Sequence, residues 1–131
     1  MGTWDTKPWD NDEVADWFGG LMDKTGLAHE IEAALNGDIE EGYDGDAQVI
    51  RAAAAVLLLL GHTYVWPVAD LERHLALAIS RVEEIIAKGL DEYARESIHA
   101  ELSVLRARLA ILQSRTGGFQ PAAPDGRWWC F

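Results

Sequence analysis

Apolar side chains recur at helical spacing over the second half of this 131-residue chain. Between residues 68 and 88 the apolar series is Leu71, Leu75, Ile79, Val82 and Ile86, and after Gly89 it continues with Ile98, Leu102, Leu105, Leu109 and Leu112. Both series have the period of an amphipathic helix, and the second has the spacing of a coiled-coil seam. We therefore predict two long helices that pair as an antiparallel hairpin, with Asp91 as the N-cap of the second and Arg106, Arg108 and Arg115 complementing its macrodipole.

The N-terminal part carries the signature of a helix start. Asp10 is the predicted N-cap, Glu13 lies three residues later in capping-box position, and Trp9 is placed to contact Val14 as a hydrophobic staple. One apolar stripe follows, formed by Val14, Trp17, Phe18, Leu21 and Met22. We expect Trp17 to pack in the core, and Asp12, Asp16 and Asp23 to lie off the stripe.

Three further segments complete the fold prediction. A short helix is expected over residues 25–36, ending at Gly37, and a glycine-rich acidic loop over 37–46. Residues 46–60 are apolar nearly all round, with Arg51 the one charge after the cap, so this segment should be the central helix, closed by Gly61. The fold class is therefore all-α: a single compact bundle of about five helices over residues 1–115.

The remaining residues, 116–131, combine glycine, proline and aromatic side chains without periodicity and form a predicted irregular tail. Its end exposes Trp128, Trp129 and Phe131 unless they contact another surface. We expect these side chains to dock on the bundle. The alternative is a homo-oligomer formed through the tail or through the seam of the last helix.

The charge of the chain is strongly uneven. The formal net charge is −11, and the acidic excess lies in residues 1–50, which hold Lys7 and Lys24 as their only basic residues. Such a chain repels nucleic acid and anionic lipid, and the apolar run 52–60 is too short to cross a bilayer. The N-terminus lacks a signal-peptide pattern, and the single Cys130 allows no internal disulfide, so a reducing cytoplasm is the expected location.

The chain contains residue types that are common in catalytic and metal sites, but their spacing matches no known motif. Glu96 and His99 form one Glu-x-x-His pair, whereas a di-iron site in a bundle needs two pairs and further carboxylates. Four histidines (His29, His62, His74 and His99) show no ligand spacing. Phosphate loops, nucleophile elbows and zinc motifs are not found, so no metal, cofactor or catalytic residue is predicted.

The N-terminal residues resemble a known family. Gly2-Thr3-Trp4, Pro8-Trp9-Asp10-Asn11-Asp12 and Ala15-x-Trp17 are similar to the opening motif of the bacterial DUF4259 family, and residues 105–110 agree more loosely. The chain departs from the family pattern at Asp5 (usually Gly), Trp9 (usually Phe) and Ala55 (where a Glu is expected within the alanine run). The resemblance implies a small helical domain and supplies no reaction. The candidate motif or interaction residues are Trp4, Trp9, Asp10, Asn11, Asp12, Asp16 and Trp17.

Two functional hypotheses from different classes follow. The first is a non-enzymatic protein-interaction module whose acidic half, residues 10–46, docks a basic partner, as an immunity or inhibitor protein would mask a cationic toxin or nuclease. The second is an enzyme or ligand-binding protein that uses Asp10, Asp12 and Asp16, with His62, around a tryptophan-lined cleft. The sequence favours the first and leaves catalysis open.

Overall fold

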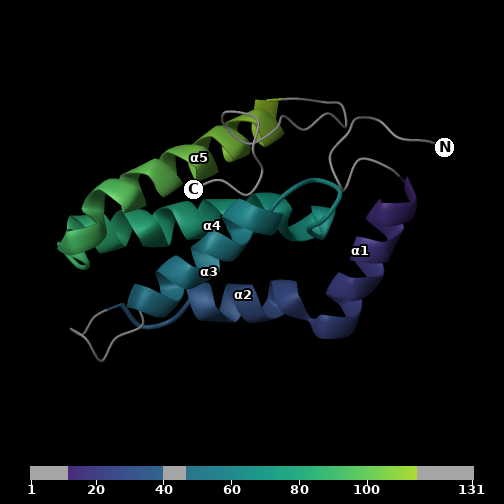
Figure 1. Ribbon diagram of the computed structural model, residues 1–131, viewed down its shortest axis with the longest axis horizontal. Helices are drawn as coiled ribbons and strands as arrows, with labels where there is room; N and C mark the ends of the chain where they lie inside the picture. The colour runs from purple at the N-terminus through teal and green to yellow at the C-terminus, as the bar shows by residue number, and fades with distance from the viewer. Residues whose placement is uncertain (1–11, 40–46, 115–131) are drawn as a thin grey trace.

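The computed structural model describes residues 12–39 and 47–114. Five α-helices follow one another along the chain (Figure 1): α1 (Asp12–Thr25), α2 (Leu27–Leu35), α3 (Ala47–Leu60), α4 (Val68–Ala87) and α5 (Arg95–Ser114). A single 3-10 turn at Glu92–Ala94 precedes α5. The described residues contain no strand, and the predicted all-α fold of about five helices is confirmed.

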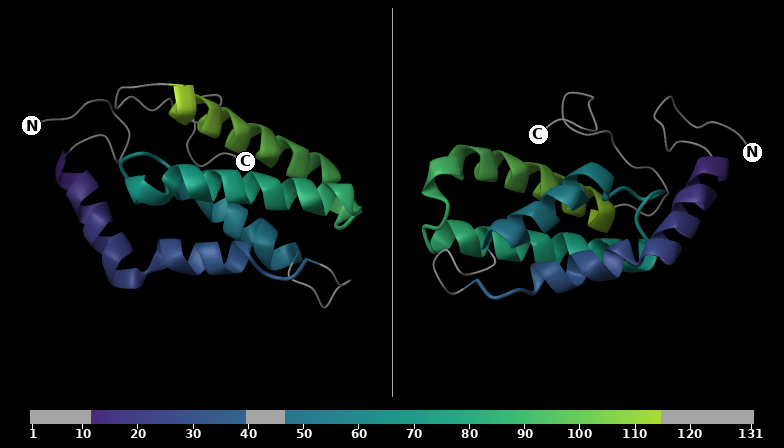
Figure 2. Two further views of the ribbon diagram at one scale, coloured as in Figure 1. Left: turned by 180° about the vertical axis from the view of Figure 1, so that it is seen from behind. Right: turned by 60° about the horizontal axis from the view of Figure 1, so that its bottom comes forward.

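The hairpin of α4 and α5 is confirmed and forms one side of the bundle, as both views of Figure 2 show. Ile98, Leu102 and Leu105 are buried, and Leu109 and Leu112 pack partly buried against the same core. The apolar seam of α5 is therefore used within the chain. The central helix α3 packs against α2, α4 and α5, with Ile50 and Leu57 fully buried.

Two arginines of the hairpin satisfy the ends of the shorter helices. Arg81 on α4 donates from Nε to the carbonyl of Leu35, the last residue of α2 (2.9 Å). Arg108 on α5 is buried and donates to the carbonyls of Leu57 and Leu58 in the last turn of α3 (3.0 and 2.6 Å). Because the final carbonyls of a helix have no partner within it, each arginine caps a neighbouring helix.

These contacts correct two sequence expectations. Arg108 complements the macrodipole of α3 and not that of its own helix, while Arg106 pairs with Glu83 of α4 on the surface. Asp91 makes no side-chain cap and instead accepts a hydrogen bond from Arg51 (3.3 Å), with its backbone in the left-handed region (φ 53°). The predicted caps at Asp10 and Arg115 lie outside the described residues.

None of the helices in the described part of the chain combines the length and the apolar composition that a bilayer span requires. The glycine-rich segment expected as a loop is described only up to Ile39, which is buried in the core. Residues 116–131, the predicted tail, also fall outside the described ranges. The division into a domain over 1–115 and a tail thus stays a prediction.

Candidate functional site

Helix α1 lies at one end of the bundle, set apart from the α4 and α5 hairpin (Figures 1 and 2). The chain turns between α1 and α2 at Gly26, whose left-handed backbone (φ 63°) suits glycine because it has no Cβ. Thr25 supports this turn: its hydroxyl donates to the carbonyl of Leu21 (2.8 Å) and accepts from the backbone amide of Leu27 (3.3 Å). The turn directs α1 away from the axis of α2.

The side chains of α1 are more exposed than the sequence indicated. Met22 alone of the predicted stripe is buried, Val14 and Phe18 are half-buried, and Leu21 is 37% exposed. Trp17 is 61% exposed, so the expectation that it packs in the core is wrong. Its ring meets Phe18 edge-on, with centroids 5.1 Å apart. Because α1 covers only one end of the bundle, the described residues offer its stripe too little apolar surface to bury it along its whole length.

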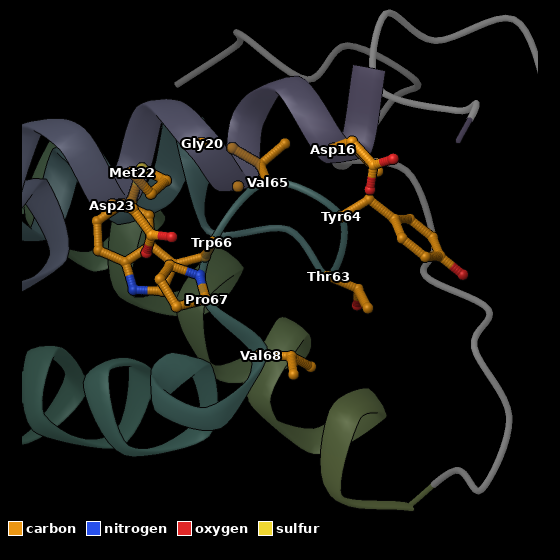
Figure 3. Close-up of a pocket in the computed structure, with 12 residues that line it drawn as sticks. Asp16, Gly20, Met22, Asp23, Thr63, Tyr64, Val65, Trp66, Pro67 and Val68 are labelled. Carbon is orange, nitrogen blue, oxygen red and sulfur yellow. The ribbon is translucent and has the colours of Figure 1, made fainter. Parts of the chain in front are cut away.

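A pocket of about 340 Å³ lies between α1 and the segment that joins α3 to α4 (Figure 3). On the α1 side it is lined by Asp16, Gly19, Gly20 and Asp23, and on the other side by residues 63–68. Both carboxylates are exposed, and the ring of Trp66 forms part of the buried wall. The pocket therefore joins an acidic rim to an apolar floor.

The structure places only part of the predicted site. Asp16 borders the pocket, and Trp17, the next residue, is exposed on α1. Asp12 begins α1. Trp4, Trp9, Asp10 and Asn11 lie outside the described residues. The grouping of all seven candidate residues thus stays a prediction.

A chain of polar contacts behind the pocket wall was missed by the sequence analysis. The indole nitrogen of Trp66 donates to Nδ1 of His74 (3.0 Å), and Nε2 of His74 lies 3.0 Å from Glu32 of α2. The second oxygen of Glu32 accepts from Arg73 (2.6 Å), which also binds Asp70. The hydrogen bonds from His74 and Arg73 lower the pKa of the Glu32 carboxyl below its usual value. These hydrogen bonds connect Trp66, in the wall of the pocket, to α2 and α4.

The other histidines do not join the pocket. His62 is fully buried and is not among the residues that line this pocket with Asp16. His29 and His99 are exposed, as is Glu96, which agrees with a solvated face for the Glu-x-x-His pair. Over the described ranges, 12–39 and 47–114, no three His, Cys, Asp or Glu residues group as metal ligands would.

The comparison with known families covers most of the chain, up to the last turn of α5. The family described as Domain of unknown function (DUF4259) matches residues 2–110. The chain belongs to this family. The matched range contains the N-terminal motif, α1 and both walls of the pocket, whereas residues 111–131 lie outside it. No curated protein and no solved structure matches the chain.

Proposed function

We propose that this DUF4259 domain is a protein-interaction module that binds a basic partner protein through α1. The observation that carries the proposal is the exposure of Trp17, an indole that is 61% accessible on a helix with exposed carboxylates. Tryptophan is enriched among the residues that dominate binding energy at protein interfaces. A large apolar side chain left accessible beside acidic groups suits a partner that offers an apolar pocket with basic residues around it.

The charge distribution supports a basic partner. Residues 12–39, which contain α1 and α2, hold seven acidic residues and one lysine. Glu13, Asp16 and Asp23 are all exposed on α1. A surface of one sign raises the encounter rate with a partner of the opposite sign and disfavours wrong partners. A cationic toxin or nuclease, masked by this chain as an immunity or inhibitor protein, has the required charge.

The test uses three baits: the wild-type chain, Trp17→Ala and Tyr93→Ala. Tyr93 is the matched control because it is a fully exposed aromatic residue (101%) in the connection between α4 and α5. We expect one basic protein to be captured stoichiometrically from host lysate by the wild type and by Tyr93→Ala. Trp17→Ala should weaken binding by at least about 2 kcal/mol, roughly thirtyfold, if Trp17 is a hot spot. Equal binding by all three baits would contradict a role for α1.

Salt dependence gives a second readout for the purified pair. Exposed charges are screened over a distance of about 8 Å at physiological ionic strength, so affinity should fall as salt rises. Asp16→Asn combined with Asp23→Asn should flatten this dependence, because both carboxylates are exposed on α1. An affinity that does not change with salt would contradict the electrostatic part of the proposal.

The pocket favours one alternative, a small-molecule site with Asp16 and Asp23 at its rim. Its volume of about 340 Å³ lies within the range of ligand sites, and a cationic ligand would complement the two carboxylates. A ligand bound there should perturb the NMR signals of Thr63 and Val68, and should be lost in Asp16→Asn. A partner bound on the outer face of α1 should instead perturb Trp17 while leaving Val68 unchanged.

A further inference from the structure

The outer side of α3 has little of the polar covering that a helix surface normally has. Six residues of this helix are neither buried nor packed against the core, and they form its outer side: Gln48, Val49, Arg51, Ala52, Ala55 and Leu59. Arg51 is the only charged member, and Gln48 is the only other polar one. Val49 is 52% exposed, and Ala52 is also exposed. The outer sides of α4 and α5, by contrast, carry exposed charges such as Glu72, Arg73 and Arg95.

A helix that is apolar all round is normally buried on every side. The described helices cover only one side of α3, through contacts with α2, α4 and α5. A depression of about 250 Å³ lies at the edge of the uncovered side, next to α5, and is lined by Gln48, Arg51, Ala52, Ala55 and Glu101. It is smaller than most small-molecule sites, and its size suits a single aromatic ring. Some further apolar group is needed to cover this face.

The chain itself carries a segment with matching chemistry. Residues 116–131 end in Arg127-Trp128-Trp129-Cys130-Phe131, whose aromatic side chains need an apolar surface. The residues between Ser114 and Trp128 span roughly 45 Å when extended, whereas α3, with 14 residues, is about 21 Å long. The bonds from Arg108 to Leu57 and Leu58 hold the last turns of α5 beside the end of α3. The segment therefore starts next to the uncovered face and reaches all of it.

Arg51 offers a specific contact in the depression. Its guanidinium binds Glu101 through two hydrogen bonds (3.0 and 2.8 Å) and also Asp91, yet its side chain stays 24% exposed. These partners fix the orientation of the guanidinium. An indole placed over it gains a cation–π interaction, for which tryptophan is the best aromatic side chain.

We propose that the C-terminal segment, residues 116–131, folds back onto the outer face of α3 and places the indole of Trp128 or Trp129 in the depression beside Arg51. A second copy of the chain is the less favourable occupant, because each copy has a net charge of −11 and two copies repel each other. The covalently attached segment has an effective concentration near the millimolar range, which a second copy reaches only in concentrated solution. The proposal is independent of the partner proposed for α1.

Disulfide trapping in the full-length chain tests this placement. Cys130 is the only cysteine, so a second one introduced on α3 reports its proximity to the end of the chain. Val49→Cys and Ala52→Cys place a thiol at exposed positions on the outer face of α3, and Ser80→Cys is the matched control at an exposed position of α4. With oxidised glutathione, we expect an intramolecular disulfide to form several-fold faster in at least one α3 variant than in Ser80→Cys.

Two outcomes would overturn the proposal. In one, the intramolecular disulfide forms in both α3 variants no faster than in the Ser80→Cys control. The other is a disulfide between two chains through residue 49 or 52, together with a doubled mass in light scattering, which would show that a second copy covers the face.

A second measurement needs no added cysteine. The full-length variant with both Trp128→Ala and Trp129→Ala should uncover the α3 face and increase the fluorescence of a bound hydrophobic dye several-fold over wild type. The variant Trp17→Ala serves as the control, because it removes an exposed indole without uncovering α3. Dye fluorescence that stays at the wild-type level in the double variant would contradict the proposal.

Discussion

The indole nitrogen of Trp66 donates a hydrogen bond to Nδ1 of His74 across 3.0 Å, and both side chains are almost completely buried. Since the indole N–H is only a donor, Nδ1 of His74 must accept and carries no proton. The proton of the neutral imidazole then sits on Nε2, which donates to Glu32 (3.0 Å). The pair thus fixes one tautomer of a buried histidine at the wall of the pocket.

Replacing Trp66 with Phe should destabilise the fold. The variant keeps an aromatic ring but leaves Nδ1 of His74 buried without its donor, which costs about 1–3 kcal/mol. Urea denaturation measures the change in the free energy of unfolding. The double variant Trp66→Phe with His74→Leu should lose less stability than the sum of the two single variants, because it leaves no orphaned acceptor. Strict additivity would contradict the coupling between the two residues.

Glu32 should contribute to stability in a pH-dependent way. Hydrogen bonds from His74 and then Arg73 lower the pKa of its carboxyl in the folded chain from the ordinary value of 4.5. A lowered pKa stabilises the fold above pH 4.5, and this contribution is lost as the pH falls through the lowered pKa. Glu32→Gln should therefore lower the Tm at pH 7, and the difference from wild type should narrow toward pH 3. The control Glu30→Gln, at an exposed position of the same helix, should show no such narrowing.

The sequence was sufficient for the helices but not for the contacts that join them. The hairpin follows from apolar spacing such as Ile98, Leu102 and Leu105, which is a local pattern. The bonds from Arg81 to Leu35 and from Arg108 to Leu57 connect residues 46 and 51 positions apart. Such pairs depend on how the helices are arranged, and neither propensity nor periodicity encodes that arrangement.

In the candidate site, too, local features were predictable from the sequence and contacts between distant segments were not. The sequence correctly placed Asp16 and Asp23 off the apolar stripe of α1, because helical period alone decides which side a residue faces. It wrongly placed Trp17 in the core, since burial requires a neighbouring surface, and the described residues at this end of the bundle do not supply one. The opposite wall of the pocket comes from residues 63–68, far along the chain. No spacing within the sequence indicates that these segments meet.

Arg108 should be more important for stability than its neighbour Arg106. Burial lowers the pKa of Arg108 to about 10, so the side chain stays charged at pH 7 and holds the last carbonyls of α3. Arg108→Met keeps much of the volume but removes the guanidinium donor from both carbonyls, of which Leu57 keeps its bond from the Gly61 amide, at a cost of about 1–3 kcal/mol. Arg106→Met, which breaks the exposed pair with Glu83, should cost less than about 1 kcal/mol. Equal unfolding midpoints for the two variants would contradict the capping role.

Gly61 should tolerate no side chain at the end of α3. A Cβ there would lie 2.5 Å from the carbonyl oxygen of Leu57, a backbone atom that also accepts bonds from Gly61 and Arg108. Gly61→Ala must therefore displace the last turn of α3, and we expect a loss of about 1–3 kcal/mol, as for other overpacked sites.

The matched substitution is Gly19→Ala on α1, where a Cβ meets nothing within 4 Å. Because glycine in a helix interior is less favourable than alanine by roughly 0.5–1 kcal/mol, this variant should be as stable as wild type or more so. Thermal unfolding of both variants measures the contrast. If Gly61→Ala unfolded at the wild-type temperature, the close approach of residue 61 to the end of α3 would not constrain the fold.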